Sequence, residues 1–218
     1  MPRDTRDRIL VAAKRMFNEQ RFGNVTIAAL AKEVGIAEGN LWYHFKNKRV
    51  LLEALTEQFI VHLERRLSIL PTHKGNVLGE FAFLLLECAH EIREFRFLYR
   101  DQADYGEHTD VLLRELPEIY RRTIGQFQQF FEAMIRKGDL DWPHNQADQL
   151  ASNVVIILRY NLEYMRERGL DESGAVHASL HQQLTLYENR MRQEAAEQLR
   201  LYLSPDETHW PEPAAGQA

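Results

Sequence analysis

The segment from Thr26 to Lys48 constrains the fold of this chain more than any other stretch of its sequence. Thr26 precedes an apolar run and predicts a helix N-cap, and Gly35 follows the run and predicts its end. Apolar residues between them repeat at i, i+3, i+4 and i+7, at Ile27, Leu30, Ala31 and Val34. The segment therefore predicts a short amphipathic helix that ends in a glycine turn.

A second short helix follows this turn, and few of its residues are apolar. Ile36 and Leu41 are placed to pack it back onto the first helix. The remaining faces are shared by Ala37, Glu38, Gly39, Asn40, Trp42, Tyr43 and His44. Two short helices joined in this way form a helix-turn-helix, which is typical of proteins that read the major groove of DNA.

Gly39 is an unfavourable residue inside a helix, by roughly 1 kcal/mol relative to Ala. One reason to accept this cost is a close approach to another surface, such as a DNA groove. The alternative is that Gly39 marks a frayed turn. The residues on both sides favour the groove interpretation.

The flanking segments complete a small three-helix core. Apolar residues repeat at helical spacing from about Thr5 to Gln20, and Phe22 is placed to close the core. Asn47 can cap a new helix that begins at Lys48. The N-terminus of that helix is an anion site because of its dipole and free N–H groups, and Lys48 adds a full charge there.

Charge is distributed unevenly along the chain. Residues 1–50 contain ten Lys and Arg against five Asp and Glu, a net charge of +5, whereas the whole chain carries −5. The remaining residues therefore carry −10. A basic head on an acidic body is expected when only the head meets a polyanion, although solubility alone can also favour a basic helical head.

The stretch from Leu10 to Leu55 resembles the DNA-binding head of the tetracycline-repressor (TetR) family of bacterial transcription regulators. The matching residues include Phe22-Gly23, Val34-Gly35-Ile36, Gly39, Leu41, Tyr43-His44-Phe45 and Lys46-Asn47-Lys48. Two positions depart from the family pattern. Ala37 stands where Ser or Thr usually caps the recognition helix, and Trp42 stands where a phosphate-binding Tyr is common. The indole N–H of Trp42 can donate to a phosphate instead.

The resemblance and the residues together predict an all-α, ligand-responsive DNA-binding transcription regulator. We expect it to act as a repressor that binds a palindromic operator as a homodimer and is released by a small hydrophobic effector. We expect residues 1–47 to form the helix-turn-helix domain, residues 48–203 a helical effector-binding and dimerisation domain, and residues 204–218 a disordered tail rich in proline. We expect Thr26, Trp42 or Tyr43, His44 and Lys48 to hold phosphates. Ala37 to His44 would enter the major groove, with Glu38, Gly39 and Asn40 at base edges.

Composition narrows the protein class further. At 218 residues with 44% hydrophobic residues, the chain can bury a real core. The charged start predicts no signal peptide, and no apolar run reaches the roughly 20 residues that a membrane span needs. The single cysteine, Cys88, excludes an internal disulfide. We expect a cytoplasmic protein with no membrane association, no cofactor and no bound metal.

The rest of the sequence predicts helices throughout. Pro117 is expected to break a helix or to start one. Two long closing helices are expected at residues 145–168 and 173–203. Apolar stripes on them predict a homodimer, with Val155, Leu158, Leu162 and a heptad stripe of Leu180, Leu184, Tyr187 and Met191 at the interface. The alternative is that these residues form intramolecular core.

The middle of the chain is aromatic, which favours a pocket for a small hydrophobic or aromatic effector. The candidate lining residues are Phe81, Phe97, Tyr99, Tyr120, Phe127 and Phe131. Ordinary core packing is the alternative, because aromatic residues at helical spacing often serve only as core. Most relatives in the resembled family carry a pocket between these helices.

Two other function classes remain open. The same fold can bind DNA without an effector, as a chromosome-organising or division-control protein. An all-helical enzyme is the third class, but the sequence contains no phosphate loop and no nucleophile motif. We therefore expect a double-stranded DNA operator as the main partner and no catalytic residues.

Overall fold

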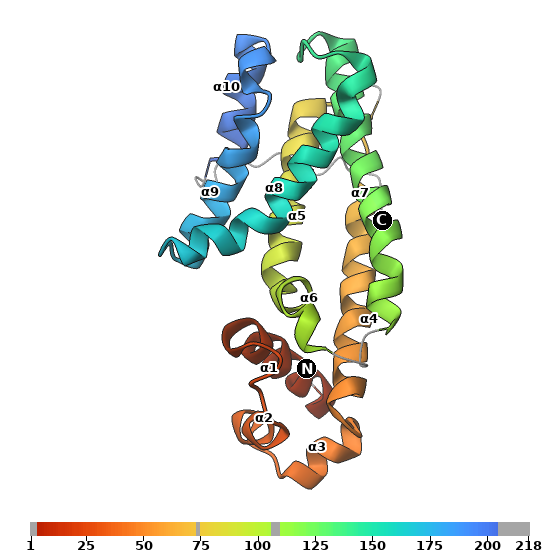
Figure 1. Ribbon diagram of the computed structural model, residues 1–218, viewed down its shortest axis with the longest axis vertical. Helices are drawn as coiled ribbons and strands as arrows, with labels where there is room; N and C mark the ends of the chain where they lie inside the picture. Colours follow the sequence, from red (N-terminus) through yellow and green to blue (C-terminus); the bar gives the residue numbers. More distant parts are fainter. Residues whose placement is uncertain (1–3, 73–74, 106–109, 205–218) are drawn as a thin grey trace. The chain divides into compact units, whose positions relative to one another are not determined.

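The computed structural model describes residues 4–72, 75–105 and 110–204 of the chain (Figure 1). Regular structure in these ranges is helical, apart from one isolated antiparallel bridge between Leu140 and Met191. The predicted all-α fold is confirmed. The predicted tail lies outside the described residues from position 205 onward.

The helices follow one another with short connections. In chain order they are α1 (Thr5–Gln20), α2 (Ile27–Val34), α3 (Glu38–His44), α4 (Lys48–Leu67), α5 (Val77–Glu94), α6 (Arg96–Arg100), η1 (Gln102–Asp104), α7 (Asp110–Lys137), η3 (His144–Gln146), α8 (Ala147–Glu167), α9 (Glu172–Leu184), η4 (Glu188–Arg190) and α10 (Gln193–Tyr202). No helix in the described ranges combines the length and the apolar character needed to cross a membrane.

The chain divides into two compact units. The N-terminal unit holds Met1–Glu64 and Glu91–Pro117, and the C-terminal unit holds Arg65–His90 and Glu118–Ala218. The N-terminal unit is therefore larger than the helix-turn-helix alone, because most of α4 and the segment around α6 belong to it. A functional domain boundary after Asn47 stays a prediction.

The N-terminal unit is built on the core predicted from helical spacing. Ile9, Leu10, Ala13, Met16 and Phe17 of α1 are all buried, as are Leu30 and Ala31 of α2. Figure 1 shows α1 and α2 beside each other, with α3 leading directly into α4. Leu41 and Phe45 close the core from the α3 side, since both are buried.

The C-terminal unit has an aromatic centre and a pair of packed helices. The rings of Phe81 on α5 and Phe131 on α7 lie 5.4 Å apart between centroids, and Tyr187 lies 5.3 Å from Phe131. Helices α8 and α9 pack along each other. The buried faces of these helices supply the rest of the core.

Two sequence predictions about helix ends were wrong. Pro117 neither breaks nor starts a helix, because it lies inside the continuous α7. The predicted single helix over residues 173–203 is divided, since α9 ends at Leu184 and α10 begins at Gln193. Backbone pairing explains the second break: the N–H of Asp141 donates to the Arg190 carbonyl at 2.8 Å, and the N–H of Arg192 donates to the Asp139 carbonyl at 2.9 Å.

Candidate nucleic-acid interface

The two caps expected for α2 are both present. The hydroxyl of Thr26 accepts a hydrogen bond from the Ala29 N–H at 3.1 Å, which satisfies one of the free N–H groups at the start of α2. Gly35 adopts the left-handed conformation with φ of 73° and ends the helix. The turn between α2 and α3 is therefore set by local sequence.

Helix α3 presents most of its side chains to solvent. Leu41 is its single buried residue, whereas Ala37, Glu38, Gly39 and Asn40 are exposed. Trp42 is 41% exposed and Tyr43 is 83% exposed, which is unusual for large aromatic side chains. A short helix fixed by one buried leucine, with exposed aromatic and polar side chains, has the form of an element that contacts a partner.

Gly39 is not required by the packing of the chain itself. A Cβ built on Gly39 meets no atom within 4 Å, and its φ is not positive. Neither a steric clash nor a left-handed backbone therefore explains the glycine. The packing of the chain therefore leaves the glycine unexplained, and a close approach of DNA at this position stays a prediction.

The aromatic end of α3 holds Tyr43 and His44 together. Their ring centroids lie 5.4 Å apart in an edge-to-face arrangement, and His44 is half-buried. Ala37 precedes α3 without a side-chain cap, as its lack of a hydroxyl predicts. The next helix, α4, is capped by Asn47, whose Oδ1 accepts from the Val50 N–H at 2.9 Å.

Lys48 is placed differently from the other phosphate candidates. Its amine donates to the carbonyl oxygen of Phe22 and lies 4.1 Å from the centre of the Phe22 ring. The side chain is half-buried, and its charge is directed toward the turn between α1 and α2. A phosphate contact by Lys48 stays a prediction, but the structure gives this residue an internal role as well.

Two basic residues near the N-terminus also make internal contacts that the sequence pattern did not reveal. Arg8 donates to the Val34 carbonyl at 2.5 Å and so caps the C-terminus of α2. Arg6 lies over the Phe45 ring at 5.3 Å. Neither contact has a local sequence signal, because each joins residues far apart in the chain. By contrast, the basic residue Lys46, in the turn before α4, is exposed.

The six candidate pocket residues do not all lie in one unit. Phe97 and Tyr99 belong to the N-terminal unit, where Phe97 packs against Phe17 at 5.5 Å. Phe81, Tyr120 and Phe127 belong to the C-terminal unit together with Phe131. The ring of Phe81 packs edge to face against those of Phe127 and Phe131, and all three side chains are fully buried. The core-packing interpretation accounts for these contacts.

The predicted interface residues of α8 and α9 are buried within a single chain. Val155, Leu158 and Leu162 of α8 are buried, and so are Leu180, Leu184 and Tyr187. The heptad stripe is also interrupted, because Tyr187 and Met191 lie beyond the end of α9. These residues match the intramolecular alternative. The apolar residues that α8 exposes are Ile156 at 54%, Tyr160 at 62% and Tyr164 at 55%.

Comparison with known proteins identifies the family. A model of the TetR bacterial transcriptional repressors matches residues 58–199, and a model of the tetR-family bacterial regulatory proteins matches residues 9–55. The chain belongs to the TetR family. It is therefore a DNA-binding transcription regulator of the repressor type, and the resemblance seen in the sequence is confirmed.

Three individual relatives with long alignments share between 21% and 30% of their aligned residues with this chain. The nucleoid occlusion factor SlmA of Marinomonas sp. (strain MWYL1) is 30% identical over 140 residues, which cover 63% of this chain and 68% of SlmA. A TetR-family regulator from Marinobacter aquaeolei VT8 has a TM-score of 0.80 at 21% identity, covering 92% of this chain and 98% of its own. The SmeT–triclosan complex has a TM-score of 0.52 at 21% identity, and the match covers 88% of this chain and 93% of the SmeT chain.

Proposed function

We propose that this TetR-family chain binds a palindromic operator as a homodimer and is released from it by a small hydrophobic effector. The exposed face of α3 carries the proposal. Trp42 and Tyr43 are exposed there, and Gly39 has no packing reason to be a glycine. Such a helix suits insertion into the major groove, where an α-helix fits between the backbones.

The residues of this face divide by the chemistry they offer. Trp42, Tyr43 and His44 carry N–H or O–H donors that suit phosphate oxygens, and the exposed Thr26 lies at the start of α2. Glu38 can accept from the amino group of cytosine, and Asn40 can pair with adenine. Ala37 and Gly39 are small enough to let the backbone come close to the bases.

A homodimer is needed because one short reading helix contacts too few bases to be specific. The exposed stripe on α8 supports it: Ile156, Tyr160 and Tyr164 follow at i, i+4 and i+8 on one helix face. An exposed stripe of this kind is a candidate for burial against a second copy. Two-fold symmetry of the dimer then requires an inverted repeat in the operator.

The effector part of the proposal draws on a structural relative. SmeT was solved as a complex with triclosan, and its chain is similar in fold to this one. The C-terminal unit of the present chain is rich in aromatic residues around Phe81 and Phe131. A ligand that favours a state unable to bind DNA lowers operator affinity tenfold for about 1.4 kcal/mol of coupling.

The likeness to SlmA favours a second candidate function, which is effector-independent DNA binding in nucleoid occlusion. The two candidates differ in where the protein binds and in what releases it. An operator-bound repressor occupies few genomic sites near regulated genes, whereas a nucleoid occlusion factor occupies many dispersed sites. Genome-wide mapping of bound sites distinguishes them.

Selection of binding sites from random double-stranded DNA tests the DNA-binding proposal. We expect an inverted repeat with half-sites about one helical turn apart. Asn40→Ala and Glu38→Gln should change the preferred bases, at roughly 1–3 kcal/mol for each base contact. Glu57→Gln, an exposed change on α4, is the control. Identical selected motifs from wild type and both α3 variants would remove these residues from base reading.

A further inference from the structure

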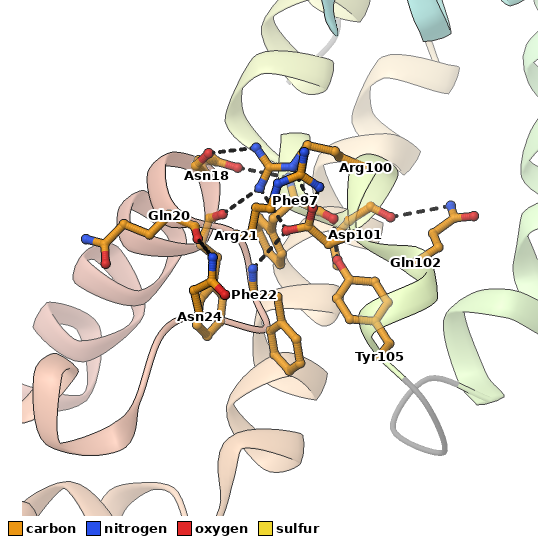
Figure 2. A network of polar contacts seen from close by, with 12 residues as sticks. Asn18, Gln20, Arg21, Phe22, Asn24, Phe97, Arg100, Asp101, Gln102 and Tyr105 are labelled. Carbon is orange, nitrogen blue, oxygen red and sulfur yellow. Dashed lines mark hydrogen bonds and ion pairs between the residues drawn. The ribbon is translucent and has the colours of Figure 1, made fainter.

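The turn between α1 and α2 is held by residues of the segment that follows α5, all within the N-terminal unit (Figure 2). Asn18, Arg21 and Phe22 lie on one side of this contact, and Arg100 and Asp101 lie on the other. The two sides are about 80 positions apart in the sequence, as the Phe22–Asp101 separation of 79 shows. The connection that leads from α1 into the helix-turn-helix is therefore in contact with a distant segment of the chain.

The end of α1 has a strained backbone and needs caps for its last carbonyl groups. Arg21, directly after α1, has φ of 70° and ψ of 146°, and it is the sole non-glycine residue with positive φ in the described ranges. Residues other than glycine rarely adopt this backbone conformation, and it persists only when surrounding contacts impose it. Arg100 and Asp101 contact the backbone on both sides of this position, and Nη1 of Arg21 itself lies 3.8 Å from Oδ1 of Asp101.

Arg100 satisfies the carbonyl groups at the end of α1. Its Nη1 donates to the Asn18 carbonyl at 2.9 Å, and its Nη2 donates to the Phe17 carbonyl at 2.9 Å. The same guanidinium donates to both carboxylate oxygens of Asp101, at 2.5 and 2.8 Å. A planar guanidinium suits this task because its donors form a fixed fork.

Asp101 holds the residue after the strained position. Its Oδ2 accepts a hydrogen bond from the Phe22 N–H at 2.8 Å, and Asp101 as a whole is only 2% exposed. A buried carboxylate is tolerated only when charged and polar partners surround it, and Arg100 and the Phe22 amide are such partners. Lys48 of α4 donates to the Phe22 carbonyl, so both the backbone N–H and the backbone carbonyl of Phe22 are hydrogen-bonded to side chains.

Aromatic packing holds the Phe22 side chain in the same place. Its ring lies 5.0 Å from that of Tyr105 and 5.0 Å from that of Phe17, both edge to face. The Tyr105 hydroxyl in turn donates to the Phe97 carbonyl. The turn that leads into α2 is thus fixed through backbone and side chain together.

We propose that Arg100 and Asp101 are positioning residues for DNA recognition, which hold the strained α1–α2 turn and thereby set the placement of α2 and α3. This inference rests on the DNA-binding function proposed above. Neither residue needs to touch DNA. Loss of either residue should not change the number of phosphate contacts, but it should place the contacting groups less accurately. Operator affinity should therefore fall while its salt dependence is retained.

The test uses the full-length protein with Asp101→Asn and Arg100→Lys. Asp101→Asn keeps the shape and removes the charge, and Arg100→Lys keeps the charge and removes the fork. We expect hydrogen exchange of the Phe22 amide to become at least about tenfold faster in Asp101→Asn. Operator affinity should fall about tenfold in each variant, with an unchanged slope of log affinity against log salt.

Arg121→Gln is the matched control, since it breaks an exposed ion pair with Glu118 in the other unit. It should change neither readout. The double variant Arg100→Lys with Asp101→Asn should lose less affinity than the two single losses combined, because both residues serve one cluster. If Asp101→Asn does not fold, the milder Arg100→Lys carries the same comparison.

Three results would overturn the inference. Unchanged Phe22 exchange in both variants would show that the pair does not hold the turn. Faster exchange with full operator affinity would show that the turn does not matter for recognition. A reduced salt slope in Arg100→Gln, which removes the charge that Arg100→Lys keeps, would assign Arg100 to a phosphate. If wild-type protein selects no DNA, the proposed function fails, while the exchange measurement still decides whether the pair holds the turn.

Discussion

The amine of Lys48 is directed at Phe22, because its Nζ donates to the Phe22 carbonyl and lies 4.1 Å from the centre of the Phe22 ring. It also lies 5.6 Å from the ring of Phe17. A cation over two aromatic rings and on a turn carbonyl stabilises the start of α4 against the α1–α2 turn. The charge at the N-terminus of α4 is therefore engaged within the chain.

The internal contacts of Lys48 lead to a prediction that competes with the phosphate contact expected from the sequence. If the amine serves the turn, Lys48→Met lowers operator affinity without changing its salt dependence. Lys46→Met is the comparison, because Lys46 is exposed in the turn between α3 and α4. It should reduce the slope of log affinity against log salt by about one for each head. Operator binding over a salt titration checks both variants. A reduced slope for Lys48→Met would return Lys48 to the phosphate contacts.

Local sequence was sufficient to predict the parts of the head that depend on local physics. The Thr26 cap, the left-handed Gly35 and the buried face of α1 all follow from spacing and residue type. The division of the last helix could not be predicted in this way. Residues 185–192 contain neither Gly nor Pro, and the break is accompanied by pairing with Asp139 and Asp141, about 50 positions earlier.

The roles of charged residues were the least predictable part of the site. Arg8, Lys48 and Arg100 each donate to a backbone carbonyl near a helix end or turn. A sequence shows only that these residues are basic, and a basic head is consistent with DNA contacts. Which cations face DNA and which cap a helix depends on long-range placement.

Gly39 provides a test in which stability and binding should change in opposite directions. A Cβ at this position meets open space, so Gly39→Ala should stabilise the fold by up to about 1 kcal/mol. If α3 enters the groove as proposed, operator affinity should nevertheless fall, because the added methyl group would lie between the helix and the DNA. Thermal unfolding and operator titration measure the two effects.

Gly125 is the matched control for this change. It lies within α7, and a Cβ there also meets no atom within 4 Å. Gly125→Ala should raise stability by a similar amount and leave operator affinity unchanged. Full operator affinity in Gly39→Ala would show that the glycine is not needed for close approach to DNA.

The stability of the protein should depend on pH through His181. Burial lowers the pKa of His181, and His177 lowers it further, with ring centroids 4.3 Å apart. Because the folded-state pKa lies below the ordinary value near 6.5, the unfolded chain takes up a proton first as the pH falls. This contribution to stability is therefore lost progressively as the pH falls below about 6.5.

We predict that His181→Gln flattens the dependence of the unfolding free energy on pH between about 7.5 and 5. His177→Gln should remove only part of it, since burial is the larger cause and remains. Urea unfolding at several pH values measures both variants. Equal pH dependence in wild type and His181→Gln would contradict the prediction.

The exposed stripe of α8 gives a prediction about assembly. Tyr160 is 62% exposed in the single chain, so a charge at this position should cost the monomer little stability. If the stripe is buried in a homodimer, Tyr160→Glu places a charge in an apolar interface and weakens the dimer. We expect sedimentation to show wild-type dimers and Tyr160→Glu monomers at micromolar concentration, with loss of operator binding.

Val61→Glu, on α4 with 72% exposure, is the control that should remain dimeric. Dimers of equal strength in Tyr160→Glu would place the interface on another surface, and a monomeric wild-type protein would remove the basis for a palindromic operator.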